Sequence, residues 1–169
     1  MDEIASLLEP QIPALRRYAW ALLRDHEAAD DLVQDTLERA ISRWSQRRRE
    51  GDLRAWLFTI QRNLFLNAVR QRRTRGTQVG EEVLDDVQAP GMSPESHAGL
   101  RDILAGLDAL PEEQRSLLLL VGVEDLSYEQ AAQVMGIPLG TVMSRLSRAR
   151  ARLRDFMENG RGTTLRRVK

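Results

Sequence analysis

Clusters of arginine are the feature of this sequence with the clearest chemical use. Arginine supplies 24 of the 25 basic side chains in the 169 residues, and these arginines gather in two blocks. Residues 39–76 hold 11 basic and two acidic side chains, and residues 136–169 hold nine basic and two acidic ones. A guanidinium can bind a phosphate or a guanine edge through two parallel hydrogen bonds, so each block predicts contact with a polyanion.

Acidic segments precede and separate the two basic blocks. Residues 1–38 carry three basic and nine acidic side chains, and residues 77–135 carry two and 12, so the formal net charge is zero. Because phosphate affinity depends on local clusters of cations, the zero net charge does not exclude nucleic acid. The alternative is that the blocks are ordinary solvated faces and that the use of arginine reflects genomic base composition.

The second basic block follows a pattern typical of a helix-turn-helix. Ser127 and Gln130 have the spacing of a capping box, and Ala132, Gly136 and Val142 supply the small residue, turn glycine and apolar anchor of the motif. In the second helix, hydroxyls of the first turn can reach phosphate and an arginine one turn later can reach a base edge. The outward residues expected to contact duplex DNA are Thr141, Met143, Ser144, Arg145, Ser147 and Arg148. An amphipathic surface helix in a helical hairpin is the alternative.

The sequence gives no support for catalysis or metal binding. It has no cysteine, and neither His26 nor His97 stands at a metal-ligand spacing from carboxylates. A nucleophile elbow and a phosphate-binding loop are also absent from it. We therefore expect no catalytic residue, no metal and no cofactor.

Export and membrane insertion also have no sequence signal. Asp2 and Glu3 stand where a signal peptide would be basic, and no apolar run approaches the roughly 20 residues of a spanning helix. The lack of cysteine suits a reducing compartment. We expect a cytoplasmic protein.

Helices must position the basic residues, because the apolar patterns of the sequence have the period of a helix and not that of a strand. Apolar spacing predicts helices over residues 14–23, 26–48 and 53–73, the last two behind the N-caps Asp25 and Asp52. Further on, Ser93 and Pro94 begin a helix, and another runs from Pro111 to about residue 122. The expected fold class is all-α.

A linker is expected between the two basic blocks. Residues 77–92 combine glycine, proline and acidic residues without a sustained apolar period, which is typical of a mobile segment. We therefore expect two small helical domains, residues 1–76 and 93–158, joined by this flexible linker. Residues 159–169 are expected to form a basic, flexible tail.

These motifs resemble those of a known family. Residues 126–132 (LSYEQAA) and 140–148 (GTVMSRLSR) look like region 4 of a bacterial sigma factor, a helix-turn-helix domain. Residues 30–36 (DDLVQDT) are similar to region 2.2, and residues 53–63 (LRAWLFTIQRN) to regions 2.3 and 2.4, of the helical region 2 bundle. The resemblance covers roughly residues 8–156 and is to the short extracytoplasmic-function (ECF, group 4) class. Within that class it is to the general-stress, EcfG-like group.

The resemblance implies a promoter-specificity subunit of RNA polymerase. A stripe on the helix over residues 26–48 would dock on the clamp helices of the polymerase beta-prime subunit, whereas without the family it would more often be a solvated face. The residues of this core-binding stripe are Asp31, Leu32, Gln34, Asp35 and Glu38. The polymerase beta flap, promoter DNA and an anti-sigma factor are the other partners that the family implies.

The resemblance also assigns DNA elements to the basic residues. The loop near residues 47–53 and the helix after it would open the minus-ten element and hold its strand. The residues expected there are Arg47, Arg48, Arg49, Arg54, Arg62 and Asn63. The helix-turn-helix would read the minus-thirty-five element, where Met143 replaces a basic residue of many relatives and could contact a thymine methyl group.

Two other functions stay open. A stand-alone helix-turn-helix repressor would need a dimerisation element, and the sequence shows none. A sigma-like mimic could sequester an anti-sigma factor without binding DNA, but such a mimic would have no use for the basic helix ends.

Overall fold

The computed structural model describes residues 1–76 and 91–166, with side chains to Asn159. Every regular element in these two ranges is helical, so the all-α expectation is confirmed. The α-helices are α1 (Asp2–Leu8), α2 (Ile12–Leu23), α3 (His26–Ser42), α4 (Leu53–Thr74), α5 (Pro94–Asp108), α6 (Glu112–Leu117), α7 (Tyr128–Met135) and α8 (Leu139–Arg166). None of the helices described is both long enough and apolar enough to cross a membrane.

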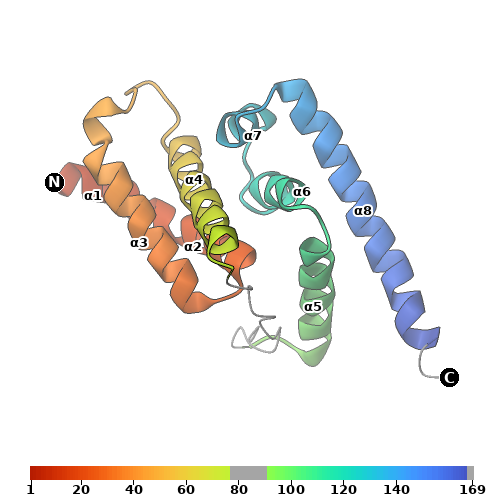
Figure 1. The fold of residues 1–169 in the computed structure, drawn as a ribbon. Coiled ribbons are helices and arrows are strands. Elements are labelled where there is room, and N and C mark those ends of the chain that lie inside the picture. The colour runs from red at the N-terminus through yellow and green to blue at the C-terminus, as the bar shows by residue number, and fades with distance from the viewer. Residues whose placement is uncertain (77–90, 167–169) are drawn as a thin grey trace.

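The N-terminal half packs α2, α3 and α4 around one another (Figure 1). Its centre holds Tyr18 and Phe58, whose rings meet edge to face with centroids 5.4 Å apart. The predicted N-caps are confirmed, since the Asp25 carboxylate accepts from the amides of residues 27 and 28, and that of Asp52 from the amide of Ala55 at 2.8 Å. Satisfying these amides fixes where α3 and α4 begin.

The helix predicted over residues 26–48 was too long. It ends at Ser42, because Arg43 leaves the helical conformation with φ −106° and ψ 11°, and a short 3-10 turn follows at Trp44–Gln46. This turn brings Trp44 onto Trp56, with ring centroids 6.0 Å apart. The first helix, α1, was missed altogether, since seven residues are too few for a clear apolar period.

The C-terminal half is built from α5 to α8. Ser93 caps α5 as predicted, and the predicted helix near residues 111–122 is present as α6 continued by a π-helical turn, Leu118–Val123. Gly136 ends α7 at φ +66°, a conformation that glycine adopts without strain. Helix α8 reaches Arg166, so residues 159–166, expected as part of a flexible tail, are helical.

The two halves pack against each other. In Figure 1, α4 faces α6 and α7, while α8 lies on the far side of the C-terminal half. One hydrophobic cluster crosses the boundary, joining Leu15 and Phe58 of the first half to Leu104, Leu107 and Leu120 of the second. The linker expected over residues 77–92 falls, except for its last two residues, outside the described ranges.

Candidate nucleic-acid interface

The helix-turn-helix of α7 and α8 is held by its own small core. Leu117, Ala131, Val142 and Leu146 are buried together in it. The predicted capping box is confirmed, since the Ser127 hydroxyl accepts from the Gln130 amide at 3.1 Å and the Gln130 side chain accepts from the Ser127 amide at 2.8 Å. These contacts fix the start of α7 and so the angle at which α8 follows it.

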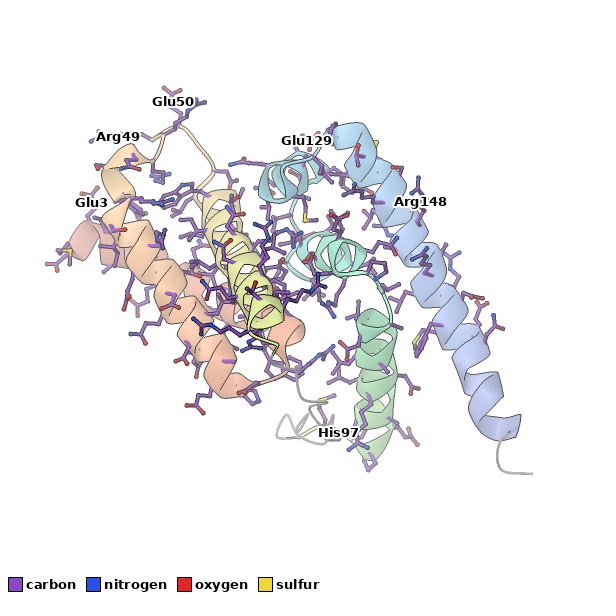
Figure 2. The ribbon with its side chains drawn as sticks, in the orientation of Figure 1. Glu3, Arg49, Glu50, His97, Glu129 and Arg148 are labelled. Carbon is purple, nitrogen blue, oxygen red and sulfur yellow. The ribbon has the colours of Figure 1, made fainter. Side chains whose placement is uncertain are left out.

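The outer face of α8 is open to solvent. The predicted contact residues Met143, Ser144, Ser147 and Arg148 are exposed, and Thr141 is half-buried. Figure 2 shows Arg148 on the side of α8 away from α4. Arg145 differs, because its Nη1 lies 2.8 Å from Glu113 Oε2 and the ion pair holds the guanidinium against α6. These predicted contact residues therefore form a mixed face, with hydroxyls, the Met143 thioether and the exposed guanidinium of Arg148.

The loop between α3 and α4 presents two exposed cations. Arg48 and Arg49 are exposed, and Figure 2 shows Arg49 beside Glu50 at this end of the molecule. Arg47 instead supports the loop, since its guanidinium lies 4.8 Å from the Trp44 ring centroid and donates to the Gly51 carbonyl at 3.3 Å. A cation over an aromatic face is stabilised by the ring quadrupole.

Asn63 and Arg62, neighbours in the sequence, lie on different faces of α4. Successive side chains on a helix diverge by about 100°, so one face cannot hold both. Asn63 is exposed and lines a groove of about 310 Å³ between α3 and α4. The sequence analysis did not single out the other polar residues of this groove, which are Arg39, Arg43, Asn67 and Arg70. Asn67 and Arg70 could have been found by extending the helical register of α4 from Asn63, whereas Arg39 and Arg43 come from α3 and its C-terminus.

Arg62 is buried between the two halves, at 5% exposure. Its Nη2 donates to Glu112 Oε2 at 3.0 Å, and its Nη1 donates to the other oxygen of that carboxylate and to the Ser116 hydroxyl. Tyr18 donates to the same hydroxyl at 3.0 Å. Burial alone would raise the pKa of Glu112, but the hydrogen bonds from Arg62 and Ser116 outweigh it and hold that pKa below its ordinary value.

A second ionic contact surrounds Glu124, whose side chain is 1% exposed. Its carboxylate accepts from Arg17 Nε at 3.1 Å and Nη2 at 3.0 Å, and from Arg54 Nη2 at 3.3 Å. Arg54 Nη2 also donates to the Glu124 carbonyl at 2.6 Å. The hydrogen bond to Glu124 raises the pKa of Arg17. Asp125, at φ +58°, makes the left-handed turn that follows.

In this structure Arg54 and Arg62 therefore lie in the contact between the halves, while Asn63 and the loop arginines face solvent. A third contact completes it, in which Arg24 Nη2 donates to the Leu104 carbonyl and to Asp108, each at 3.3 Å. Desolvation lowers the pKa of Arg24, against the attraction of Asp108. Sequence patterns within single helices could not reveal these pairs, whose members stand 50 to 107 positions apart.

The predicted acidic stripe is displayed on α3. Asp31, Gln34, Asp35 and Glu38 are exposed, and Gln34 donates to Glu38 at 3.2 Å. Leu32 differs, because it is buried at 8% exposure. It lies at a groove of about 400 Å³ between α3 and α4, which Asp31 and Asp35 also line.

Among the described residues, no group of three or more histidine, aspartate or glutamate side chains is placed to hold a metal ion.

Comparison with known proteins identifies both halves. The model for the sigma2 domain of PhyR matches residues 8–61, and that for sigma-70 region 4 matches residues 100–153. The chain is 40% identical over 153 residues to the ECF RNA polymerase sigma factor EcfG of Rhodopseudomonas palustris (strain TIE-1), which covers 90% of this chain and 83% of that protein. The chain belongs to the ECF RNA polymerase sigma factors.

Solved structures resemble this ECF sigma factor over most of its length. The sigma factor RpoE of Bartonella quintana, in complex with the anti-sigma factor NepR, has a TM-score of 0.78 at 35% identity, over 94% of this chain and 98% of that one. PhyRSL of Sphingomonas sp. Fr1, also in complex with NepR, has a TM-score of 0.65 at 26% identity, over 90% and 87%. The family resemblance expected from the sequence is confirmed, including its likeness to EcfG.

Proposed function

We propose that this ECF sigma factor directs RNA polymerase core to the promoters of a stress regulon in the cytoplasm, with no catalysis of its own. The observation that carries the proposal is the pair of open basic surfaces, one on α8 and one at the loop and groove of α3 and α4. Each surface joins guanidinium groups to uncharged hydrogen-bonding side chains, which is the chemistry of phosphate contact combined with base readout.

The upstream surface, on α8, reads the minus-thirty-five element. Arg148 contacts a base edge, Ser144 and Ser147 contact phosphate or bases, and Met143 offers an apolar contact to a thymine methyl group. Their exposure on one helix face supports this assignment. Arg145 takes a supporting role through its ion pair with Glu113.

The downstream surface binds the opened minus-ten strand. Arg48 and Arg49 attract its phosphates at the loop, and Asn63 offers an amide that can bond to an unstacked base in the groove. Arg39, Arg43 and Arg70 extend the same groove with positive charge. Single-stranded nucleic acid is commonly held by such a combination of cationic groove and polar base contacts.

The acidic stripe of α3 binds polymerase core. Asp31, Asp35 and Glu38 form an exposed row of carboxylates on α3, and complementary charge on the clamp helices would steer and orient docking. The groove beside the stripe gives a partner's apolar side chain access to Leu32. An anti-sigma factor is the proposed inhibitor, supported by the likeness to RpoE in its complex with NepR.

In vitro transcription with purified core polymerase tests the proposal. We expect promoter-dependent transcripts only when this chain and core are both present. Asp31→Lys combined with Asp35→Lys should greatly weaken holoenzyme assembly, while Asp2→Lys combined with Glu3→Lys, on exposed positions of α1, should not. Unchanged assembly with the first pair would remove the acidic stripe from the core interface.

One observation favours a second function. The matching region 2 model is that of PhyR, and the structure of PhyRSL with NepR is similar to this chain. A sigma-like mimic would bind an anti-sigma factor but give no promoter-dependent transcript with core. Specific DNA binding by the free chain without such a transcript would instead indicate a stand-alone repressor.

A further inference from the structure

The loop between α3 and α4 holds three consecutive arginines in two different environments. Arg48 and Arg49 are exposed, whereas Arg47 is half-buried. The Arg47 guanidinium lies over the ring of Trp44, and that ring in turn meets Trp56 of α4. We call Trp44, Arg47 and Trp56 the tryptophan–arginine cluster. Arg47 is therefore held in place by the chain itself.

We propose that Arg47 is a positioning residue for strand binding: it fixes the loop in a shape that presents Arg48 and Arg49 to the opened strand. The inference rests on the proposed function, because it concerns the downstream surface assigned above. It also changes the role of Arg47, which the family resemblance places in contact with the minus-ten element.

The two tryptophans attach the cluster to region 2. Trp44 belongs to the 3-10 turn that follows α3, and Trp56 belongs to the first turn of α4. Their ring planes meet at 73°, an edge-to-face contact that aromatic pairs prefer. Both side chains also pack against the hydrophobic core. The ring that Arg47 covers is therefore held by elements on both sides of the loop.

Arg47 connects the two ends of the loop. Its guanidinium carbon lies 4.8 Å from the Trp44 ring centroid at the start, and its Nη1 donates to the Gly51 carbonyl at 3.3 Å near the end. Between these points the Gly51 amide donates to the Arg48 carbonyl at 3.0 Å, which closes a tight turn. Figure 2 shows Arg49 at the outer end of this loop. One guanidinium thus holds a turn that carries the exposed cations.

A preformed loop favours strand binding through conformational entropy. A loop that became ordered only on binding would lose this entropy at that moment, and its affinity for the strand would be lower. A guanidinium suits the positioning role because its planar face stacks on an indole ring while its edge donates hydrogen bonds, whereas a lysine ammonium is a point charge. Arg47→Lys should therefore lose the positioning although it keeps the charge.

The salt dependence of strand binding distinguishes positioning from phosphate contact. The probe is a fluorescein-labelled non-template strand from the minus-ten region of a promoter that gives a transcript in the assay above. It is bound by holoenzyme reconstituted from core and the full chain, and the variants are compared at equal holoenzyme assembly. Arg47→Met should weaken binding about threefold to tenfold, the magnitude of a cation–π contact, and leave the slope of log affinity against log salt concentration unchanged.

Two further variants complete this measurement. Arg47→Lys should weaken strand binding by about the same factor as Arg47→Met, because the planar contact is lost in both. The matched control is Arg49→Met, the same substitution at an exposed position of the same loop. It should lower the magnitude of the salt slope by about 0.7, the value for one phosphate contact on a single strand.

A double substitution tests whether the ring and the cation act together. Trp44→Leu removes the aromatic face and should weaken strand binding as Arg47→Met does. The two changes combined should weaken it no more than the larger single effect, because they remove the same contact. Trp44→Phe keeps an aromatic face and should retain most of the affinity. A combined effect equal to the product of the single effects would contradict the proposed coupling.

Loop motion gives a readout that does not depend on DNA. Nuclear spin relaxation of the free chain should give lower order parameters for the amides of residues 48–51 in Arg47→Met than in the parent. Arg49→Met should match the parent, because the side chain that it removes is exposed and outside the cluster.

The outcomes separate this proposal from the proposed function. A salt slope reduced in Arg47→Met as in Arg49→Met, parent-like strand affinity in Arg47→Lys, or unchanged loop order parameters in Arg47→Met would overturn the positioning role. The proposed function fails in a different way, since the unmodified chain would then give no promoter-dependent transcript with core.

Discussion

The helix-turn-helix and the ionic contact between the two halves are stabilised by different kinds of interaction. The helix-turn-helix is local and apolar, with Val142 and Leu146 buried against Ala131 and Leu117 within 30 positions of the chain. The contact between the two halves is long-range and includes ion pairs between residues as far apart as Arg17 and Glu124. A motif of the first kind keeps its shape wherever the domain goes, whereas a contact of the second kind exists only while two domains touch. The helix-turn-helix is thus the rigid part of the molecule, and the ionic contact between the two halves is the part that can change.

Removing the apolar core should cause the largest loss. Leu146→Ala deletes a side chain that is 1% exposed, and we expect it to lower the free energy of unfolding by about 2–5 kcal/mol. Met143→Ala, on an exposed position of the same helix, should change it by less than about 0.5 kcal/mol. Urea unfolding followed by circular dichroism measures both. Similar values for the two variants would mean that the helix-turn-helix is not held by its own core.

A change at Arg148, on the outer face of α8, should have an effect of intermediate size on the recognition of upstream DNA. Arg148→Ala should lose about 1–3 kcal/mol of discrimination at one upstream base pair, because a bidentate guanidinium contact specifies a guanine. Binding of the holoenzyme to promoters that differ at single upstream pairs measures this. Weakening by the same factor on every sequence would reassign Arg148 to phosphate contact.

The smallest effect is expected when acid weakens the ionic contact between the two halves. Glu112 has a pKa lowered from 4.5 in the closed chain, so its stabilisation is complete above 4.5 and is lost as the pH falls through the lowered value. Energy transfer between dyes on cysteines placed at exposed Glu9 and Glu158 should therefore stay constant near neutral pH and fall only in acid. The Glu112→Gln variant should lack this fall over pH values at which helical content is unchanged. A fall of the same size in that variant would assign the acid response to other groups.

Sequence patterns predicted the elements well and the contact between them not at all. Asp25, Asp52, Ser93 and Ser127 were identified as N-caps because a cap and its amides lie within three positions, and all four are confirmed. The end of α3 was misplaced, since Trp44 continues the apolar period of the helix although its partner, Trp56, lies on the next helix.

The candidate site also has a part that helical register predicts and a part that depends on tertiary packing. Outward positions on α8 follow from helical register, and five of the six predicted contact residues there are exposed or half-exposed without a cross-helix ion pair, Arg145 being the exception. On α4, register separates Asn63 from Arg62, but only the packing of region 4 shows that the side of Arg62 is covered. Charge in a sequence marks a residue as able to bind an anion, and tertiary structure decides whether that anion belongs to the same chain.

Helix α8 has a mechanical consequence. Its 28 residues extend about 42 Å at 1.5 Å per residue, well beyond the helix-turn-helix. Near the middle of the helix, Leu153 and Phe156 pack on Gly106 of α5, so closely that a Cβ on this glycine would lie 2.6 Å from the leucine side chain. Because α8 rests on α5 about halfway along its length, a tilt of the helix at this contact would also displace Met143 and Arg148, which come earlier in the same helix.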